Sequence, residues 1–121
     1  MKIERELPEG RNAFTAYGDG YVAVNGVRHE RSVIVAAQAL LEWTPRSVDA
    51  LSAETLAPIV EMRPEIVLIG SGETFQFPEP ASLAPLHAAR IGVEVMDTRA
   101  ACRTYNILLG EGRNVVAALI V

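Results

Sequence analysis

Apolar and polar positions between residues 12 and 36 follow a pattern typical of short β-strands. Residues 14–17 and 21–24 are two such runs on either side of a glycine-rich turn, and Asn25-Gly26 follows the second run. Asn-Gly beside such runs is a strong signal for a tight hairpin, because both turn positions need a positive φ. Residues 33–35 are β-branched and suit a buried strand. The N-terminal part of the chain therefore predicts an antiparallel β-meander, and the pattern around Trp43 fits either a strand end or a short helix.

The second half of the chain alternates between helical and strand-like periodicity. Residues 53–62 carry apolar side chains at helical spacing, with Ser52 or Thr55 available as the N-cap and Arg63-Pro64 as the stop. Apolar runs typical of strands follow at residues 66–69, 93–96 and 115–120, separated by helical segments near 81–90 and 99–110. These spacings suit crossover connections between parallel strands, although they fix neither strand order nor direction.

The whole chain therefore predicts an α/β fold in which the meander packs against a small βαβαβ unit. No linker, repeat or low-complexity segment separates the two parts. A length of 121 residues with 50% hydrophobic side chains is enough for one real core. We expect residues 1–121 to form a single compact domain.

Charge and cysteine content restrict the function. The formal net charge is -4, with 15 acidic against 11 basic side chains and no basic cluster, which argues against binding to nucleic acid or to an anionic membrane. Residues 1–8 lack the features of an export signal or a mitochondrial presequence, and the longest apolar run, residues 32–41, is about half a membrane span. A single cysteine fits a reducing compartment. We expect a soluble, cytoplasmic protein that does not insert into a membrane.

The glycine turn Gly70-Ser71-Gly72 follows a predicted strand, where a dinucleotide-binding loop would lie. The third glycine of that motif is replaced by Phe75, and Glu73 places a negative charge beside the phosphate position. No Gly-Lys-Ser or Gly-Lys-Thr of a P-loop follows. The glycines are better explained by a tight turn that requires positive φ, and no nucleotide or other cofactor is predicted.

The segment 97–110 contains the other candidate chemistry. Asp97 and Thr98 occupy the strand-to-helix junction, where their side chains can cap the helix. Helical spacing predicts that one face carries Ala101, Cys102, Tyr105, Leu108 and Leu109, and that another carries Arg99, Arg103 and Asn106. Cys102 then points toward the core. The only histidines, His29 and His87, have no ligand-spaced neighbours, so we predict no catalytic residue and no metal site.

One candidate ligand site remains, a crevice between residues 70–77 and 97–103. Ligands of open α/β sheets favour the carboxyl ends of the strands, where both segments would lie. Two arginines one helical turn apart, near a helix N-terminus, suit an anionic or carbonyl-bearing ligand, although a solvated helix face is the simpler explanation. The candidate residues are Gly70, Ser71, Gly72, Phe77, Asp97, Thr98, Arg99 and Arg103.

Several blocks of the chain resemble the Mth938-like family, a former domain of unknown function that includes the mitochondrial complex I assembly factor 3 proteins. The resemblance rests on Asn25-Gly26, Ser32-Val33, Trp43, Gly70-Ser71-Gly72, Phe77-Pro78, Gly92-Val93-Glu94-Val95-Met96, Asp97-Thr98 and Ala101-Cys102-Arg103-Thr104-Tyr105-Asn106-Ile107-Leu108. It implies a compact three-layer β/β/α fold. It also implies that eukaryotic relatives assist assembly of the respiratory NADH dehydrogenase by contacting other proteins, whereas short prokaryotic members have no established activity.

Two functional hypotheses follow. The first is a non-enzymatic interaction or assembly-accessory protein with an unknown protein partner, linked through the resemblance to respiratory or membrane-complex assembly. The alternative is a binding protein or enzyme that uses the crevice between residues 70–77 and 97–103 for a small anion. An exposed apolar patch would favour the first hypothesis, and a concave site with converging polar groups would favour the second.

Overall fold

The computed structural model of the protein describes residues 10–121. In chain order its elements are β1 (Phe14–Gly18), β2 (Tyr21–Val24), β3 (Val27–His29), β4 (Val33–Ala36), β5 (Ala39–Glu42), the 3-10 helix η1 (Val48–Ala50), α1 (Ala53–Met62), β6 (Ile66–Gly70), the 3-10 helix η2 (Pro80–Leu83), α2 (Ala84–Ala88), β7 (Gly92–Met96), α3 (Thr98–Gly110) and β8 (Val115–Leu119). Residues 1–8, on which the prediction of no export signal rests, lie outside the described residues. Within residues 10–121, no helix has both the length and the apolar character needed to cross a bilayer.

The predicted meander forms a small sheet of three antiparallel strands in the order β1-β2-β3. The turn between β2 and β3 is the predicted Asn25-Gly26 hairpin, with φ of 49° and 83°. These positive angles explain why asparagine and glycine occupy the turn. The hairpin prediction is confirmed.

The second sheet has five strands in the order β5-β4-β8-β6-β7. β6 is parallel to β7 and β8, whereas β4 is antiparallel to β5 and β8. The strand at residues 33–35 therefore belongs to this sheet and not to the meander, which corrects the sequence-based assignment. Ile34 packs into one core and Val33 and Val35 into the other, so both faces of β4 need cover, as in the middle of a sheet.

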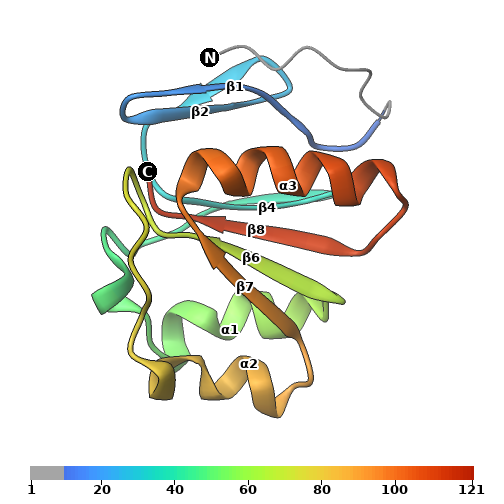
Figure 1. The fold of residues 1–121 in the computed structure, drawn as a ribbon. Helices are drawn as coiled ribbons and strands as arrows, with labels where there is room; N and C mark the ends of the chain where they lie inside the picture. Colours follow the sequence, from blue (N-terminus) through green and yellow to red (C-terminus); the bar gives the residue numbers. More distant parts are fainter. Residues whose placement is uncertain (1–9) are drawn as a thin grey trace.

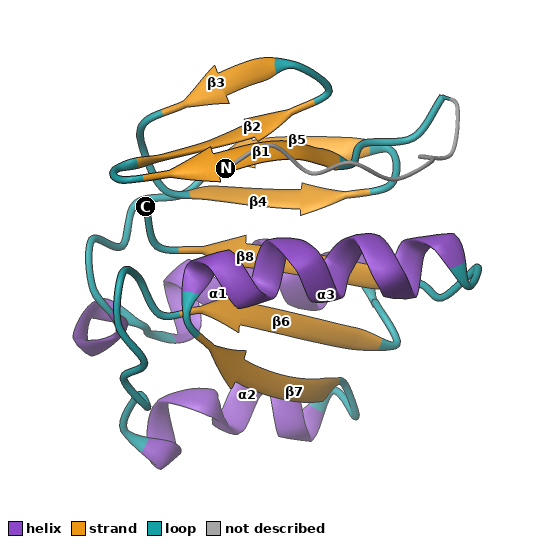
Figure 2. Ribbon diagram, turned by 45° about the horizontal axis from the view of Figure 1, so that its top comes forward, coloured by secondary structure: helices purple, strands orange, loops and turns teal. Residues whose placement is uncertain are grey.

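Helices cover both faces of the five-stranded sheet (Figures 1 and 2). α1 and α2 lie on one face and close a core that includes Leu56, Ile59 and Leu86. α3 lies on the other face, between the sheet and β1, and closes a second core that includes Tyr105 and Leu109. The predicted α/β architecture, a meander packed with a βαβαβ unit, is confirmed, with β4 and β5 added to the sheet.

Local sequence explains the bounds of α1. Ser52 is the N-cap: its hydroxyl accepts the Thr55 N–H at 3.3 Å, and Thr55 Oγ1 accepts the Ser52 N–H at 2.9 Å. Arg63 ends the helix in the left-handed conformation, with a φ of 50°. Trp43 lies just after β5 and donates from Nε1 to the Thr55 carbonyl at 2.8 Å, which ties the strand end to the helix.

The buried face of α3 differs from the prediction at two positions, since Leu108, which was predicted on that face, is only half-buried. Ala101, Cys102, Tyr105 and Leu109 are buried as predicted, but Asn106 is also buried, with 4% of its surface exposed. Its amide donates to the Phe14 carbonyl at 2.8 Å and accepts the Phe14 N–H at 2.9 Å. Helical spacing placed Asn106 on the face of the arginines; in the structure it supplies β1 with hydrogen bonds on an edge that has no neighbouring strand among the described residues.

Candidate functional site

The two segments of the predicted crevice lie side by side at the carboxyl ends of β6 and β7. The Ser71 N–H donates to the Met96 carbonyl at 2.8 Å, and the Thr98 N–H donates to the Gly72 carbonyl at 2.9 Å. Parallel strands bring these ends to one edge of the sheet, which is why the sequence could place them together.

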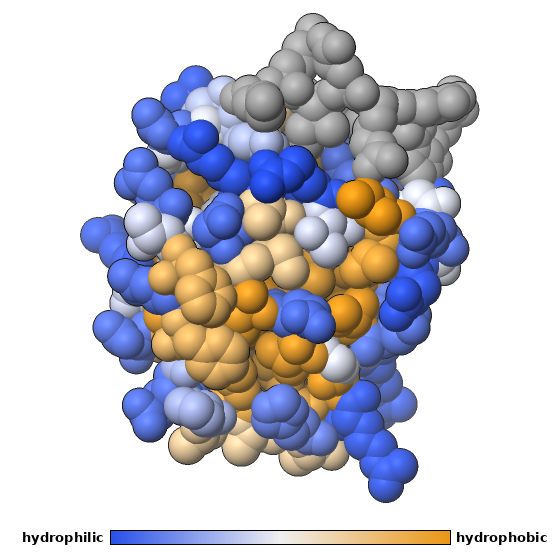
Figure 3. Space-filling model, viewed as in Figure 1, coloured by the Kyte–Doolittle hydropathy of each residue, from blue (hydrophilic) through white to orange (hydrophobic). Residues whose placement is uncertain are grey.

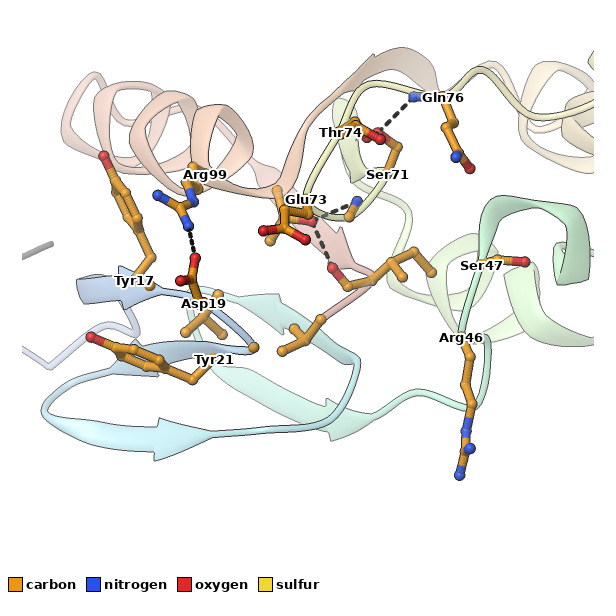
Figure 4. Close-up of a pocket in the computed structure, with 17 residues that line it drawn as sticks. Tyr17, Asp19, Tyr21, Arg46, Ser47, Ser71, Glu73, Thr74, Gln76 and Arg99 are labelled. Atoms are coloured by element: carbon orange, nitrogen blue, oxygen red, sulfur yellow. Dashed lines mark hydrogen bonds and ion pairs between the residues drawn. The ribbon is translucent and has the colours of Figure 1, made fainter.

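A pocket of about 490 Å³ opens at this edge, between the glycine turn and the β1–β2 turn (Figure 4). Four of the predicted residues line it: Ser71, Gly72, Thr98 and Arg99. The other four, Gly70, Phe77, Asp97 and Arg103, do not. The rest of the lining consists of Tyr17, Gly18, Asp19, Gly20, Tyr21, Val22, Arg46, Ser47, Glu73, Thr74, Gln76, Ile120 and Val121.

Thr98 connects two backbone segments that line the pocket, at Gly72 and Ile120. Its buried hydroxyl donates to the Ile120 carbonyl at 2.6 Å and accepts the Gly72 N–H at 2.9 Å. A Cβ on Gly70 would lie 2.9 Å from Thr98 Oγ1 and 2.7 Å from a methyl group of Leu119. Gly70 is therefore required by the close packing of α3 on β6. The sequence predicted that both glycines serve a turn with positive φ. This is confirmed for Gly72, with a φ of 111°, but is wrong for Gly70, which close packing requires instead.

Ser71 and Asp97 are also engaged within the fold. The Ser71 hydroxyl donates to the Thr74 carbonyl at 2.8 Å and accepts the Gln76 N–H at 3.0 Å, which shapes the loop after β6. The Asp97 carboxylate accepts the Ala100 N–H at 2.9 Å and caps α3, as predicted. The capping role also predicted for Thr98 is wrong, because its hydroxyl bonds to Gly72 and Ile120 instead. Because Asp97 already places a negative charge at this helix end, an anionic ligand would have to compete with it.

The two candidate arginines tie α3 to the meander. Arg99 forms an ion pair with Asp19, which is drawn in Figure 4. Arg103 donates to the Tyr17 hydroxyl at 2.6 Å, and its guanidinium carbon lies 5.6 Å from the centre of the Tyr17 ring. Arg99 faces the pocket with a carboxylate partner, whereas Arg103 does not line it.

Sequence reasoning missed the half of the pocket that the meander supplies, namely Tyr17, Asp19 and Tyr21. These residues flank a glycine-rich turn that reads as an ordinary hairpin. Nothing in the local pattern indicates which end of the second sheet this turn faces. The one available signal was electrostatic, since an exposed acid in a tight turn can pair with an arginine on a neighbouring helix.

Comparison with known proteins gives the family. Residues 14–120 match the model of a family described as a protein of unknown function, DUF498/DUF598. The chain belongs to this family. A Bordetella pertussis solution structure, described as a Mth938-like domain, is 33% identical, covers 98% of this chain and 91% of its own, and has a TM-score of 0.81. A Bordetella parapertussis crystal structure is 41% identical, covers 93% and 98%, and has a TM-score of 0.86. The predicted Mth938-like fold is confirmed.

Two curated relatives of this DUF498 chain have names that bear on function. The bovine NADH dehydrogenase [ubiquinone] 1 alpha subcomplex assembly factor 3 is 33% identical over 98% of this chain, which spans 65% of the length of the bovine protein. The 13 kDa major membrane protein of Francisella tularensis is 29% identical, and the match covers 99% of both chains. The predicted relation to complex I assembly factors is therefore confirmed at the level of the family.

The part of this DUF498 domain that the structure describes holds no group of three or more His, Cys, Asp or Glu side chains placed to bind a metal ion. His87 is exposed on α2, and His29 is half-buried at the end of β3. The two histidines lie on different elements. The assignment of no catalytic residue and no metal site stays a prediction.

Cys102 lies in the α3 core, with none of its surface exposed. Burial raises the pKa of its thiol to about 12, against an opposing effect of the nearby Arg103. A thiolate is the reactive form of cysteine, and burial suppresses both its formation and the access of a reagent.

We therefore expect the Cys102 thiol to react slowly with iodoacetamide in the native protein up to about pH 9, and rapidly after unfolding. Cys102→Ala should retain the fold with a loss of about 1 kcal/mol in the free energy of unfolding, because only a small volume is removed. Mass spectrometry of timed labelling measures the rate. Native labelling as fast as that of the unfolded chain would contradict the structural role.

Proposed function

We propose that this domain is a non-enzymatic interaction module that serves in the assembly of other proteins. The observation that carries the proposal is an apolar surface on the side of α3 and β7 (Figure 3). Figure 3 shows apolar side chains gathered over the loop after β6, over β6 and β7, and over the adjoining part of α3. The large apolar residues on these elements that are exposed or half-buried and do not pack toward the α1 and α2 core are Ile66, Phe75, Phe77, Met96, Ile107 and Leu108, which we call the α3–β7 surface.

Two phenylalanines make this surface unusual for a protein that acts alone. Phe75 is 61% exposed and Phe77 is 55% exposed, and both belong to the same loop. An aromatic ring gains free energy when it leaves water, and contiguous exposed apolar patches commonly mark protein contacts. A protein partner that covers both rings would remove them from water.

The engagement of the crevice residues also supports an interaction module over an enzyme. The hydroxyls of Ser71 and Thr98 and the carboxylate of Asp97 all hydrogen-bond to the backbone of the same domain. A nucleophile or a general base must instead reach a substrate atom. The assembly-factor names of several relatives support the part of this proposal that concerns respiratory or membrane-complex assembly. We also propose that the protein acts in the cytoplasm.

The double variant Phe75→Ser/Phe77→Ser tests the proposal. We expect it to lose at least roughly tenfold in affinity for the partner that the wild-type chain captures, because two aromatic contacts near the centre of an interface commonly dominate binding. The matched control is Val27→Ser, since Val27 is 60% exposed but lies on β3. Affinity is measured with the purified partner by calorimetry. Equal affinity of the double variant and the wild type would overturn the proposal.

The pocket supports a second candidate, binding of a small anion. The observation in its favour is that Arg99 lines a concavity of about 490 Å³. Asp19 already neutralises Arg99, so an anion would have to displace a carboxylate from it. Thermal unfolding in the presence of phosphate and of citrate separates the two candidates. Stabilisation that disappears in Arg99→Ala would favour the pocket over the α3–β7 surface.

A further inference from the structure

The outer edge of β7 carries backbone groups that the fold leaves without a strand partner. β7 is the last strand of the five-stranded sheet, and no described strand pairs with its outer side (Figures 1 and 2). The Gly92 N–H donates inward to the Glu65 carbonyl at 3.0 Å, and the Met96 carbonyl accepts the Ser71 N–H at 2.8 Å. Backbone direction alternates along a strand, so Val93 and Val95 direct their N–H and C=O groups outward.

This edge has few of the features that protect free strand edges. The ladder between β6 and β7 runs over five residues without a register shift, so no bulge twists β7 away. The strand contains no proline and only one charged residue, Glu94, which is exposed. The two outer strands of the small sheet do have such features. β3 has only three residues, and the ladder between β1 and β2 is irregular near Phe14. Long, regular edges without lysine or proline readily accept another strand.

The side chains of β7 define what could lie beside it. Val93 and Val95 pack toward the α1 and α2 core. Glu94 and Met96 therefore point to the opposite face, the one that α3 partly covers. Met96 belongs to the α3–β7 surface, so the edge and that surface are continuous. Glu94 is the only charged side chain of β7, and it lies on the same face of the strand as Met96.

We propose that the outer edge of β7 binds one extended segment of a partner protein by strand addition. The segment carries a lysine or arginine opposite Glu94 and apolar residues on either side of it. Main-chain bonds to Val93 and Val95 supply affinity, and the Glu94 contact selects the sequence. The net charge of -4 also favours a basic partner. This inference rests on the proposed function and names the chemistry of the partner.

Glu94 also argues against a second copy of this chain as the occupant. Two β7 strands related by a two-fold axis would pair in antiparallel fashion. The outward groups would bond if Val93 of one copy lay opposite Val95 of the other. That register places Glu94 opposite Glu94 in a pair without backbone hydrogen bonds, where side chains are closest. Like charges directly opposite destabilise a sheet, so self-pairing is disfavoured.

Two synthetic peptides test the recognition of Glu94. Each consists of alternating threonine and valine over about nine residues, enough to span β7, with either lysine or glutamate at the central position. We expect the lysine peptide to bind the wild-type chain at least roughly tenfold more tightly than the glutamate peptide. Glu94→Lys should reverse this order. Fluorescence anisotropy measures both affinities, and equal binding of the two peptides, or no binding of either, would overturn the proposal.

A backbone variant tests the strand geometry independently. Val95→Pro removes an N–H that points outward and leaves the ladder to β6 intact, whereas Val95→Ala removes side-chain packing and keeps the N–H. Binding of the lysine peptide should be lost in Val95→Pro and retained in Val95→Ala. Equal binding of both folded variants would overturn strand addition. If Val95→Pro does not fold, the charge reversal at Glu94 decides alone.

The partner identified through the α3–β7 surface separates this inference from the proposed function. If Phe75→Ser/Phe77→Ser lost this partner while Glu94→Lys bound it as tightly as the wild type, the proposed interaction function would stand and strand addition would be overturned. Full binding to both variants would overturn both. Sedimentation of the wild-type chain completes the test, because a dimer that Val95→Pro abolishes would make a second copy the occupant and overturn the proposed partner.

Discussion

Asn106→Leu should lower the free energy of unfolding by about 2–5 kcal/mol, although leucine has the same branched arrangement of side-chain heavy atoms. The Asn106 amide donates to the Phe14 carbonyl at 2.8 Å and accepts the Phe14 N–H at 2.9 Å, and both contacts are buried. Leucine can make neither bond. Each buried backbone group left without a partner costs about 1–3 kcal/mol, and Phe14 would have two. Urea unfolding followed by circular dichroism measures the loss.

Asn114→Ala is the matched control for this prediction. The Asn114 amide donates to the Arg63 carbonyl at 3.3 Å, but the contact is exposed, so water can replace it. We expect a change within about 0.5 kcal/mol, as for most surface substitutions. If Asn106→Leu were as stable as Asn114→Ala, α3 would not supply the hydrogen bonds that complete the free edge of β1.

The elements that the sequence predicted well are those whose signals are local. The Asn25-Gly26 turn needs positive φ at two positions, and few other residue pairs adopt it. α1 begins at Ser52 because its hydroxyl can satisfy a free N–H, and it ends where Arg63 precedes a proline. Each of these features depends on residues within one helical turn of one another. Short-range physics was therefore sufficient for them.

The features that the sequence could not place depend on contacts between distant segments. Residues 33–35 looked like part of the meander, yet they pair with β8, more than 80 residues later in the chain. Nothing near β4 indicates that pairing. Helical spacing placed Asn106 on the same face as Arg99 and Arg103, and only the position of β1 shows why a buried amide is useful there. Polarity alone cannot distinguish solvent from a buried hydrogen-bond partner.

The candidate crevice shows the same division. The carboxyl ends of two parallel strands meet by topology, so the sequence could bring Ser71 and Thr98 together. It could not show that their hydroxyls would be used by the backbone of the same domain, nor that Asp19 would reach Arg99 from the small sheet. Side-chain types alone suggested an anion site, whereas the geometry shows much of that chemistry engaged in holding the sheets and α3 together.

Gly70→Ala tests this structural interpretation of the glycine turn, and it should destabilise the fold by about 1–3 kcal/mol. The new methyl group would lie 2.7 Å from a methyl of Leu119 and 3.0 Å from the Thr98 Cα. The Thr98 Cα belongs to the first residue of α3, so relief requires the helix end to move. Such a shift would weaken the bonds from Thr98 to Ile120 and Gly72.

Gly110→Ala provides the control, since a Cβ at Gly110 meets no atom within 4 Å and the residue is exposed at the end of α3. Alanine is the better helix former by about 0.5–1 kcal/mol, so this variant should be neutral or slightly more stable. Thermal unfolding of both variants beside the wild type measures the difference. Gly70→Ala with wild-type stability would mean that the end of α3 is not packed against β6 by Thr98, and the glycine would again require a ligand to explain it.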